Sequence, residues 1–218
     1  MPAIGITGGI ATGKSAFLEE LRQLLPTATY FDADLAARDL SNHNPEVRAL
    51  IAEAFGPHIY STEGDLNRAR LRAIVFADPE KKHALEQILH PRIRRQWSLQ
   101  AESRRKSTEL FLADIPLLYE TAGETLCDRV VVVACSQPIQ LQRLMTRSSL
   151  DQAAAEEIIA AQMPLAEKIA RADHVVWNNG PREVLAAQAK TIAAYLAHGS
   201  GTAVSETAGK ASAPRGNQ

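Results

Sequence analysis

The sequence predicts an α/β protein in which a five-stranded parallel sheet lies between two layers of helices. Two observations predict this fold class: short apolar runs alternate with segments of helical spacing, and each apolar run stops near a glycine or a polar residue. Fully apolar strands separated by helices are typical of parallel sheets that are covered on both faces. The 218 residues are 45% hydrophobic and 22% charged, as in a globular chain of one or two domains.

Each predicted strand is a short run of mainly aliphatic and aromatic residues. In chain order, the runs are Ala3–Thr7, Thr29–Phe31, Leu110–Ala113, Val130–Ala134 and Val175–Trp177. Segments in which apolar residues recur at helical spacing lie between these runs and after the last one. The predicted helices include Ser15–Leu25, Leu35–Leu40, Pro79–Lys106 and Glu183–Ala197.

Two excursions interrupt the alternation of strand and helix. Residues 35–107 are too many for one crossover helix, so we interpret them as a helical substrate-binding insertion. Residues 147–171 have the size of a mobile lid. The whole domain is predicted to span residues 1–198. Its core consists of the residues outside the two excursions: 1–34, 108–146 and 172–198. Residues 199–218 contain few side chains that could form a core, which predicts a disordered tail.

The charge balance argues against polyanion binding. Lys and Arg total 24 against 25 Asp and Glu, which gives a formal net charge of −1. No apolar stretch approaches the ~20 residues that cross a bilayer, and the N-terminus lacks a secretory pattern. We therefore expect a cytoplasmic protein, a monomer or small homo-oligomer, without nucleic-acid or membrane partners.

A glycine-rich loop carries the clearest chemical signal. Residues 8–15 read Gly-Gly-Ile-Ala-Thr-Gly-Lys-Ser and fit G-x-x-x-x-G-K-[ST] between a strand and a helix. In such a P-loop the backbone N–H groups surround phosphates, while Lys14 contacts them and Ser15 binds Mg²⁺. The predicted nucleotide-binding residues here are Gly9, Ala11, Thr12, Gly13, Lys14, Ser15 and Ala16. No Asn-Lys-x-Asp segment for guanine occurs, so we favour a P-loop small-molecule kinase over a GTPase.

Carboxylates follow two of the strands. Asp32 and Asp34 are two apart, and in an extended segment they point to the same side. One could accept a proton from an attacking hydroxyl while the other holds Mg²⁺. The alternative is that Asp34 is a helix N-cap and Asp32 a turn residue. Asp114 either supports Mg²⁺ or is an ordinary residue at a strand end.

Basic residues supply candidate anion contacts. Arg143 and Arg147 are four apart on one helical face, where they could neutralise a transferring phosphoryl group or pair with acids such as Asp151. The run His90–Arg95 could receive an anionic substrate or form a solvated face. Within it, Pro91 breaks the helix or opens a new one. The other histidines show no metal-ligand spacing.

Several segments in this order resemble the dephospho-coenzyme A kinase family. They are Thr7-Gly8-Gly9-Ile10, Asp32-Ala33-Asp34 with Ala37-Arg38, Leu89-His90-Pro91, Ile115-Pro116-Leu117-Leu118 with Glu120, Arg143, Gln162, and Ala172-Asp173 leading to Asn178. The similarity runs from about Ala3 to Leu196.

The resemblance implies transfer of the ATP γ-phosphate to the ribose 3′-hydroxyl of dephospho-CoA, the final step of coenzyme A biosynthesis. It implies that Asp34 is the general base and that Asp32 supports it or, with Ser15, binds Mg²⁺. The other implied contacts divide between the two substrates. Lys14, Arg143, Asn178 and Gly180 would bind ATP, and Thr7, Asp34, Arg38, His90, Pro116, Leu117 and Leu118 would bind dephospho-CoA.

This chain departs from the family pattern in its phosphate loop. Ala11 stands where the family usually has glycine, and Thr12 where it often has serine. Alanine leaves room for phosphate if its backbone φ is negative, although it could redirect one N–H group. Two alternatives stay open: another small-molecule kinase, for a nucleotide or a shikimate-like acceptor, and an ATP-binding regulator that transfers nothing.

Overall fold

The computed structural model describes residues 3–104 and 109–198, and the tail predicted at 199–218 lies outside them. Five parallel strands form one sheet in the order β2-β3-β1-β4-β5. They are β1 (Ala3–Gly8), β2 (Thr29–Asp32), β3 (Phe111–Asp114), β4 (Arg129–Ala134) and β5 (His174–Trp177). All five predicted strands are confirmed, and their bounds shift by at most one residue. The non-sequential order leaves β1 at the centre, so the loop after β1 opens at the middle of the sheet's carboxyl edge.

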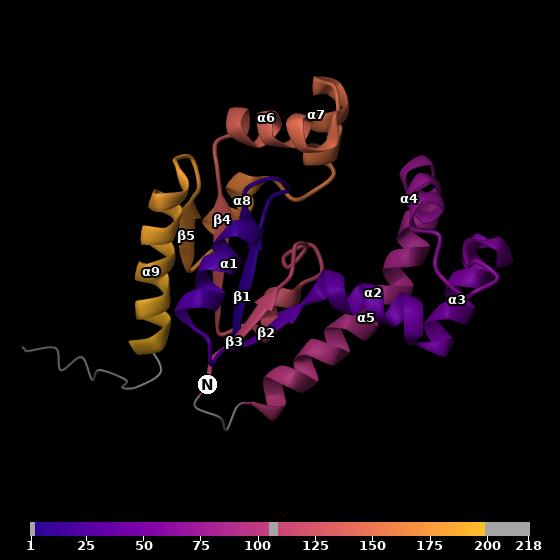
Figure 1. Ribbon diagram of the computed structural model, residues 1–218, viewed down its shortest axis with the longest axis horizontal. Helices are drawn as coiled ribbons and strands as arrows, with labels where there is room; N and C mark the ends of the chain where they lie inside the picture. The colour runs from indigo at the N-terminus through magenta and orange to yellow at the C-terminus, as the bar shows by residue number, and fades with distance from the viewer. Residues whose placement is uncertain (1–2, 105–108, 199–218) are drawn as a thin grey trace, which may run out of the picture.

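Helices cover both faces of the sheet, as predicted. On one face, α1 (Lys14–Leu24) and α9 (Arg182–His198) lie side by side (Figure 1), and Phe17 and Leu185 form a core with strand residues such as Ile6 and Val133. On the opposite face, α2 (Ala33–His43) and α8 (Leu165–Ala170) contribute to a second core. Among the described helices, none has the length and hydrophobicity that a membrane span needs.

The predicted insertion is a group of helices beside the sheet. After α2 come α3 (Pro45–Phe55), the 3₁₀ turn Pro57–Ile59, α4 (Arg68–Ala77) and α5 (Pro79–Ser103). Figure 1 shows α3 and α4 far from the sheet, with α5 running back toward it. The expectation that Pro91 breaks or opens a helix is wrong, because it lies inside a continuous α5. Burial of Ile93 and Trp97 in the second core, which the insertion shares with that face of the sheet, offsets the backbone bond that proline cannot make.

The segment predicted as a lid contains two different environments. After α6 (Gln137–Ser148), α7 (Gln152–Ala160) lies at the carboxyl edge of the sheet, where Figure 1 shows both helices clear of the strands. By contrast, α8 packs against β4, and the side chain of Lys168 is fully buried. A second 3₁₀ turn, Gly123–Leu126, precedes β4.

Candidate active site

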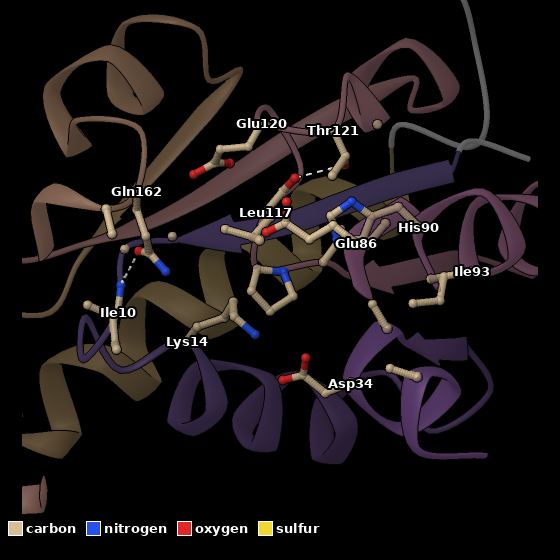
Figure 2. A pocket seen from close by; sticks show the side chains of 18 of the residues that line it. Ile10, Lys14, Asp34, Glu86, His90, Ile93, Leu117, Glu120, Thr121 and Gln162 are labelled. Carbon is tan, nitrogen blue, oxygen red and sulfur yellow. Dashed lines mark hydrogen bonds between the residues drawn. The ribbon is translucent and has the colours of Figure 1, made fainter. Parts of the chain in front are cut away.

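One large cavity of about 1720 Å³ lies at the carboxyl edge of the sheet. The phosphate loop and Asp34 line it from the core, α5 lines it from the insertion, and Arg143 and Gln162 line it from the far side. Figure 2 shows Lys14, Asp34, Leu117 and His90 around this hollow. Segments far apart in the chain therefore meet where a nucleotide and a second substrate could lie together.

The phosphate loop has the conformation that its glycines permit. Gly13 has φ 93° and directly precedes α1, whose first N–H groups have no acceptor within the helix. A Cβ at this position would come within 2.0 Å of Asn178 Nδ2, so only glycine fits. Ala11 also has a positive φ, 59°, so the negative φ under which alanine would be harmless is not what the structure has.

Lys14 reaches a cluster of carboxylates. Its ammonium pairs with Asp114 at the end of β3, and Asp32 lies beside Asp114 in the sheet register. Burial raises the pKa of the Asp114 carboxyl; Lys14 opposes this, and the nearby Asp32 and Asp34 charges add to it. Four charged groups therefore converge at the point where the phosphate loop faces β2 and β3.

The two aspartates of the Asp-Ala-Asp segment differ in their surroundings. The expectation of an extended segment is wrong, because β2 ends at Asp32 and α2 begins at Ala33. Asp32, rather than Asp34, is the N-cap: its Oδ1 accepts the Leu35 N–H at 2.9 Å. Asp34 lies in the first helical turn and lines the cavity, whereas Asp32 does not line it.

A smaller hollow of about 310 Å³ adjoins the loop on the side of α9. Gly13, Ala16, Arg143, Asn178 and Gly180 line it. Asn178 Nδ2 donates to the Thr12 carbonyl at 2.9 Å, and Arg143 Nη1 approaches the same oxygen at 3.5 Å. These contacts connect the end of β5 and helix α6 to the backbone of the phosphate loop.

Arg147 also lines the large cavity, while Asp151 caps α7 by accepting the Ala154 N–H at 2.8 Å. Asp151 is therefore not the arginine partner that the spacing suggested. Among the described residues, neither Arg143 nor Arg147 forms an ion pair. Both guanidinium groups could therefore meet phosphate.

The other end of the large cavity is formed by α5 and by the turn after β3. His90, Pro116 and Leu117 line it. Burial lowers the pKa of His90, and the Glu86 carboxylate partly opposes this, so the surroundings favour the neutral ring. In the basic run, Arg92 pairs with Glu46, and Arg94 donates to the Thr121 and Ala122 carbonyls at 2.9 and 3.0 Å. Arg92 thus connects two helices of the insertion, and Arg94 connects the insertion to the segment after β3.

Several predicted contact residues do not line the large cavity. Thr7 and Leu118 are fully buried behind the Pro116 turn, and the Thr7 hydroxyl donates to the Pro116 carbonyl at 3.0 Å. Thr12 is buried beneath the loop, where its hydroxyl binds the Gly9 carbonyl at 2.9 Å. Arg38 is exposed on α2 and does not line the cavity.

The structure gives a place in the site to four residues without an assigned role, of which Glu120 and Gln162 were named only as parts of the family resemblance. They are Glu120, Gln140, Gln162 and Lys168, which all bond near the phosphate loop or the Pro116 turn. The sequence contains one indication for Lys168: it lies three residues after Leu165, so the two side chains share one face of a helix that is otherwise apolar there. Gln140 left none that spacing could reveal.

A parallel sheet with a phosphate loop at its centre, basic side chains around it and a second-substrate pocket beside it defines a P-loop kinase. Comparisons with known proteins narrow this class. The family model described as dephospho-CoA kinase matches residues 2–183. The chain belongs to the dephospho-CoA kinase family.

Individual relatives agree with this assignment. The chain is 43% identical over 182 residues to the dephospho-CoA kinase of Geobacillus kaustophilus, covering 83% of this chain and 89% of that one. It is 41% identical to the Enterococcus faecalis enzyme, with coverages of 86% and 93%. Among solved structures, the dephospho-CoA kinase of Campylobacter jejuni superposes with a TM-score of 0.70 at 28% identity, over 90% of this chain and 98% of that one.

Proposed function

We propose that the protein transfers the γ-phosphate of ATP to the ribose 3′-hydroxyl of dephospho-CoA and releases CoA and ADP. The observation that carries the proposal is the continuous cavity that joins the phosphate loop, Asp34 and the apolar Pro116 turn. Such a cavity can hold a triphosphate at one end and a long, partly apolar acceptor at the other. Family membership supports the identity of that acceptor.

The phosphate loop and its basic neighbours would bind ATP. The first N–H groups of α1 and the helix dipole favour an anion at Gly13 and Lys14. Lys14 would exchange its bond with Asp114 for the β- and γ-phosphates, and Arg143 would offset charge on the transferring group. The smaller hollow, with Asn178 and Gly180, would receive the adenosine part.

Asp34 would be the general base. Its side chain lines the cavity, whereas the neighbouring Asp32 is occupied in capping α2. In the proposed step, the 3′-oxygen forms a bond to the γ-phosphorus while the bond from that phosphorus to the β,γ-bridging oxygen breaks. The hydroxyl proton passes to the Asp34 carboxylate, and ADP leaves with the bridging oxygen.

The donor set of this site fits Mg²⁺, the metal implied by a P-loop kinase. The Ser15 hydroxyl lines the cavity, and Asp32, Asp34 and Asp114 influence one another electrostatically close by. Among the described residues, no cluster of side chains forms a complete metal cage. We propose that Ser15 and substrate phosphates would hold the ion, which would neutralise phosphate charge when bound. Asp32 would reach it with Oδ2, directly or through water, because its Oδ1 caps α2.

The acceptor end would bind dephospho-CoA through His90, Pro116 and Leu117. We propose that Thr7 and Leu118 act from behind, because they support the Pro116 turn without lining the cavity. Arg38 follows the cavity-lining Ala37 and lies one helical turn after Asp34, so its guanidinium would contact the substrate from the rim of the cavity. That the protein is a monomer or a small homo-oligomer remains a prediction.

A coupled assay of ADP release tests the proposed function. ATP alone should turn over slowly, since a closed site that excludes water favours transfer over hydrolysis. Adding dephospho-CoA should raise the rate strongly, and mass spectrometry should identify CoA as the product. Stimulation by a nucleoside monophosphate or shikimate but not by dephospho-CoA would replace this function with another small-molecule kinase. ATP binding without transfer to any acceptor would indicate a regulator.

A further inference from the structure

Two glutamine side chains hold the two sides of the backbone at Ile10, inside the phosphate loop. Gln140 Nε2, from α6, donates to the Ile10 carbonyl at 2.8 Å. Gln162 Oε1, just after α7, accepts the Ile10 N–H at 2.9 Å (Figure 2). Gln140 is only 4% exposed, so water competes little for its bond. Both glutamines lie more than a hundred residues from Ile10 in the chain.

The residue after this clamp has an unfavourable backbone conformation. Ala11 has φ 59°, in the left-handed region, where the alanine Cβ crowds the backbone and glycine does not. Such a conformation persists only where the surrounding contacts enforce it. Thr12, on the other side of Ala11, is also fixed, because Asn178 holds its carbonyl.

Gln140 acts directly on the peptide group that joins Ile10 to Ala11, and Gln162 acts on the preceding peptide group, which carries the Ile10 N–H. This peptide is planar and trans, so its carbonyl oxygen and the Ala11 N–H point in opposite directions. Fixing the Ile10 carbonyl with Gln140 therefore fixes the direction of the Ala11 N–H as well. Because Asn178 holds Thr12, a relaxation of Ala11 toward a negative φ would rotate the Ile10–Ala11 peptide and break the Gln140 bond, and Gln162 opposes this rotation by holding the Ile10 N–H.

We propose that Gln140 and Gln162 are positioning residues that keep Ala11 in its left-handed conformation, so that the loop is preorganised for phosphate. The proposal rests on the proposed function only in requiring that the loop bind a nucleotide triphosphate. Glycine at position 11 would adopt this conformation with little strain. The clamp should therefore matter more to this chain than to the same chain carrying glycine there.

A double-mutant cycle tests this dependence. Gln140→Met and Gln162→Met each remove the hydrogen bond from the glutamine side chain to Ile10 and keep a similar side-chain length. Each substitution is made alone and together with Ala11→Gly. Binding of the non-hydrolysable ATP analogue AMP-PNP, with Mg²⁺ and without dephospho-CoA, is measured by calorimetry. In the otherwise unchanged protein, we expect each substitution to weaken binding roughly tenfold, the scale of one hydrogen bond. In the Ala11→Gly background, the loss should be about threefold or less.

The test compares the factor by which a glutamine substitution weakens AMP-PNP binding in two proteins, the otherwise unchanged protein and the Ala11→Gly variant. A factor that is at least threefold smaller in the Ala11→Gly variant supports the proposal, and any smaller difference overturns it. Gln100→Met, at an exposed position on α5, is the matched control and should leave binding unchanged. If buried Gln140→Met does not fold, Gln162→Met decides alone. Because binding is measured without acceptor, a protein that binds AMP-PNP but ignores dephospho-CoA would refute the proposed function and leave this test intact.

Discussion

Replacing Lys168 by methionine should destabilise the protein by about 3 kcal/mol. Its side chain is fully buried, and its ammonium lies 2.7 Å from Glu120 Oε1. The same ammonium is 3.5 Å from the Gly8 carbonyl and 3.4 Å from the Pro116 carbonyl. Methionine fills a similar volume but leaves the Glu120 carboxylate without its cation.

The expected magnitude follows from the surroundings of Glu120. Removing one partner of a buried ion pair costs about 3–5 kcal/mol, because the other charge stays unpaired. Glu120 keeps 21% of its side chain exposed and still accepts the Met163 N–H at 3.0 Å, which favours the lower end of that range. For a protein of this size, about 3 kcal/mol lowers Tm by roughly 6–12 °C.

Urea unfolding and calorimetry of four variants test the reasoning. Lys168→Met and Glu120→Gln should each lower the free energy of unfolding, and the double variant should lose at least about 1 kcal/mol less than the sum of the two. Lys190→Met, at an exposed site on α9, is the control and should change stability by no more than about 0.5 kcal/mol. A loss below about 0.5 kcal/mol for Lys168→Met, or strict additivity in the double variant, refutes the importance of the pair.

Three further predictions concern the chemistry of the site. Asp34→Asn should lower kcat by roughly 10²-fold or more and leave the Kd for ATP near wild type, because only the transfer step needs a base; an unchanged kcat would remove Asp34 from this role. Lys14→Ala should lower kcat/KM for ATP by roughly 10²-fold or more in the same assay, and an unaffected rate would exclude contact with the phosphates. Burial lowers the pKa of His90 below its ordinary 6.5, so the unfolded chain binds a proton more readily and the free energy of unfolding should fall as the pH drops below that value. Urea unfolding at several pH values should show a shallower fall for His90→Gln. An identical fall in both proteins would contradict the effect.

The fold could be predicted because its signals are local. Strands that are buried on both faces appear as unbroken apolar runs, and the phosphate loop is one contiguous segment. The insertion and its long helix from Pro79 were recognisable from length and spacing, but the unbroken course of that helix across Pro91 was not. The cost of Pro91 is offset by the burial of Ile93 and Trp97, which spacing around the proline does not reveal.

Side-chain orientation was harder to predict than the elements themselves. The Asp-Ala-Asp segment spans a change from strand to helix, so a period of two no longer relates Asp32 to Asp34. The sign of φ at Ala11 likewise depends on contacts from Gln140 and Gln162. Spacing within a segment carries no information about partners of this kind.

The same distant contacts limit how a lid can move. If residues 147–171 closed as one body, Gln162 would leave Ile10, and Lys168 would leave both Glu120 and the core. Moving the buried Lys168 ammonium away from Glu120 is costly, since it would find no equivalent partner on the way. A movement of α7 that leaves α8 in place breaks none of the Lys168 bonds. We therefore predict that any closing movement involves α7 but not α8, so that the moving segment is shorter than the lid expected at residues 147–171.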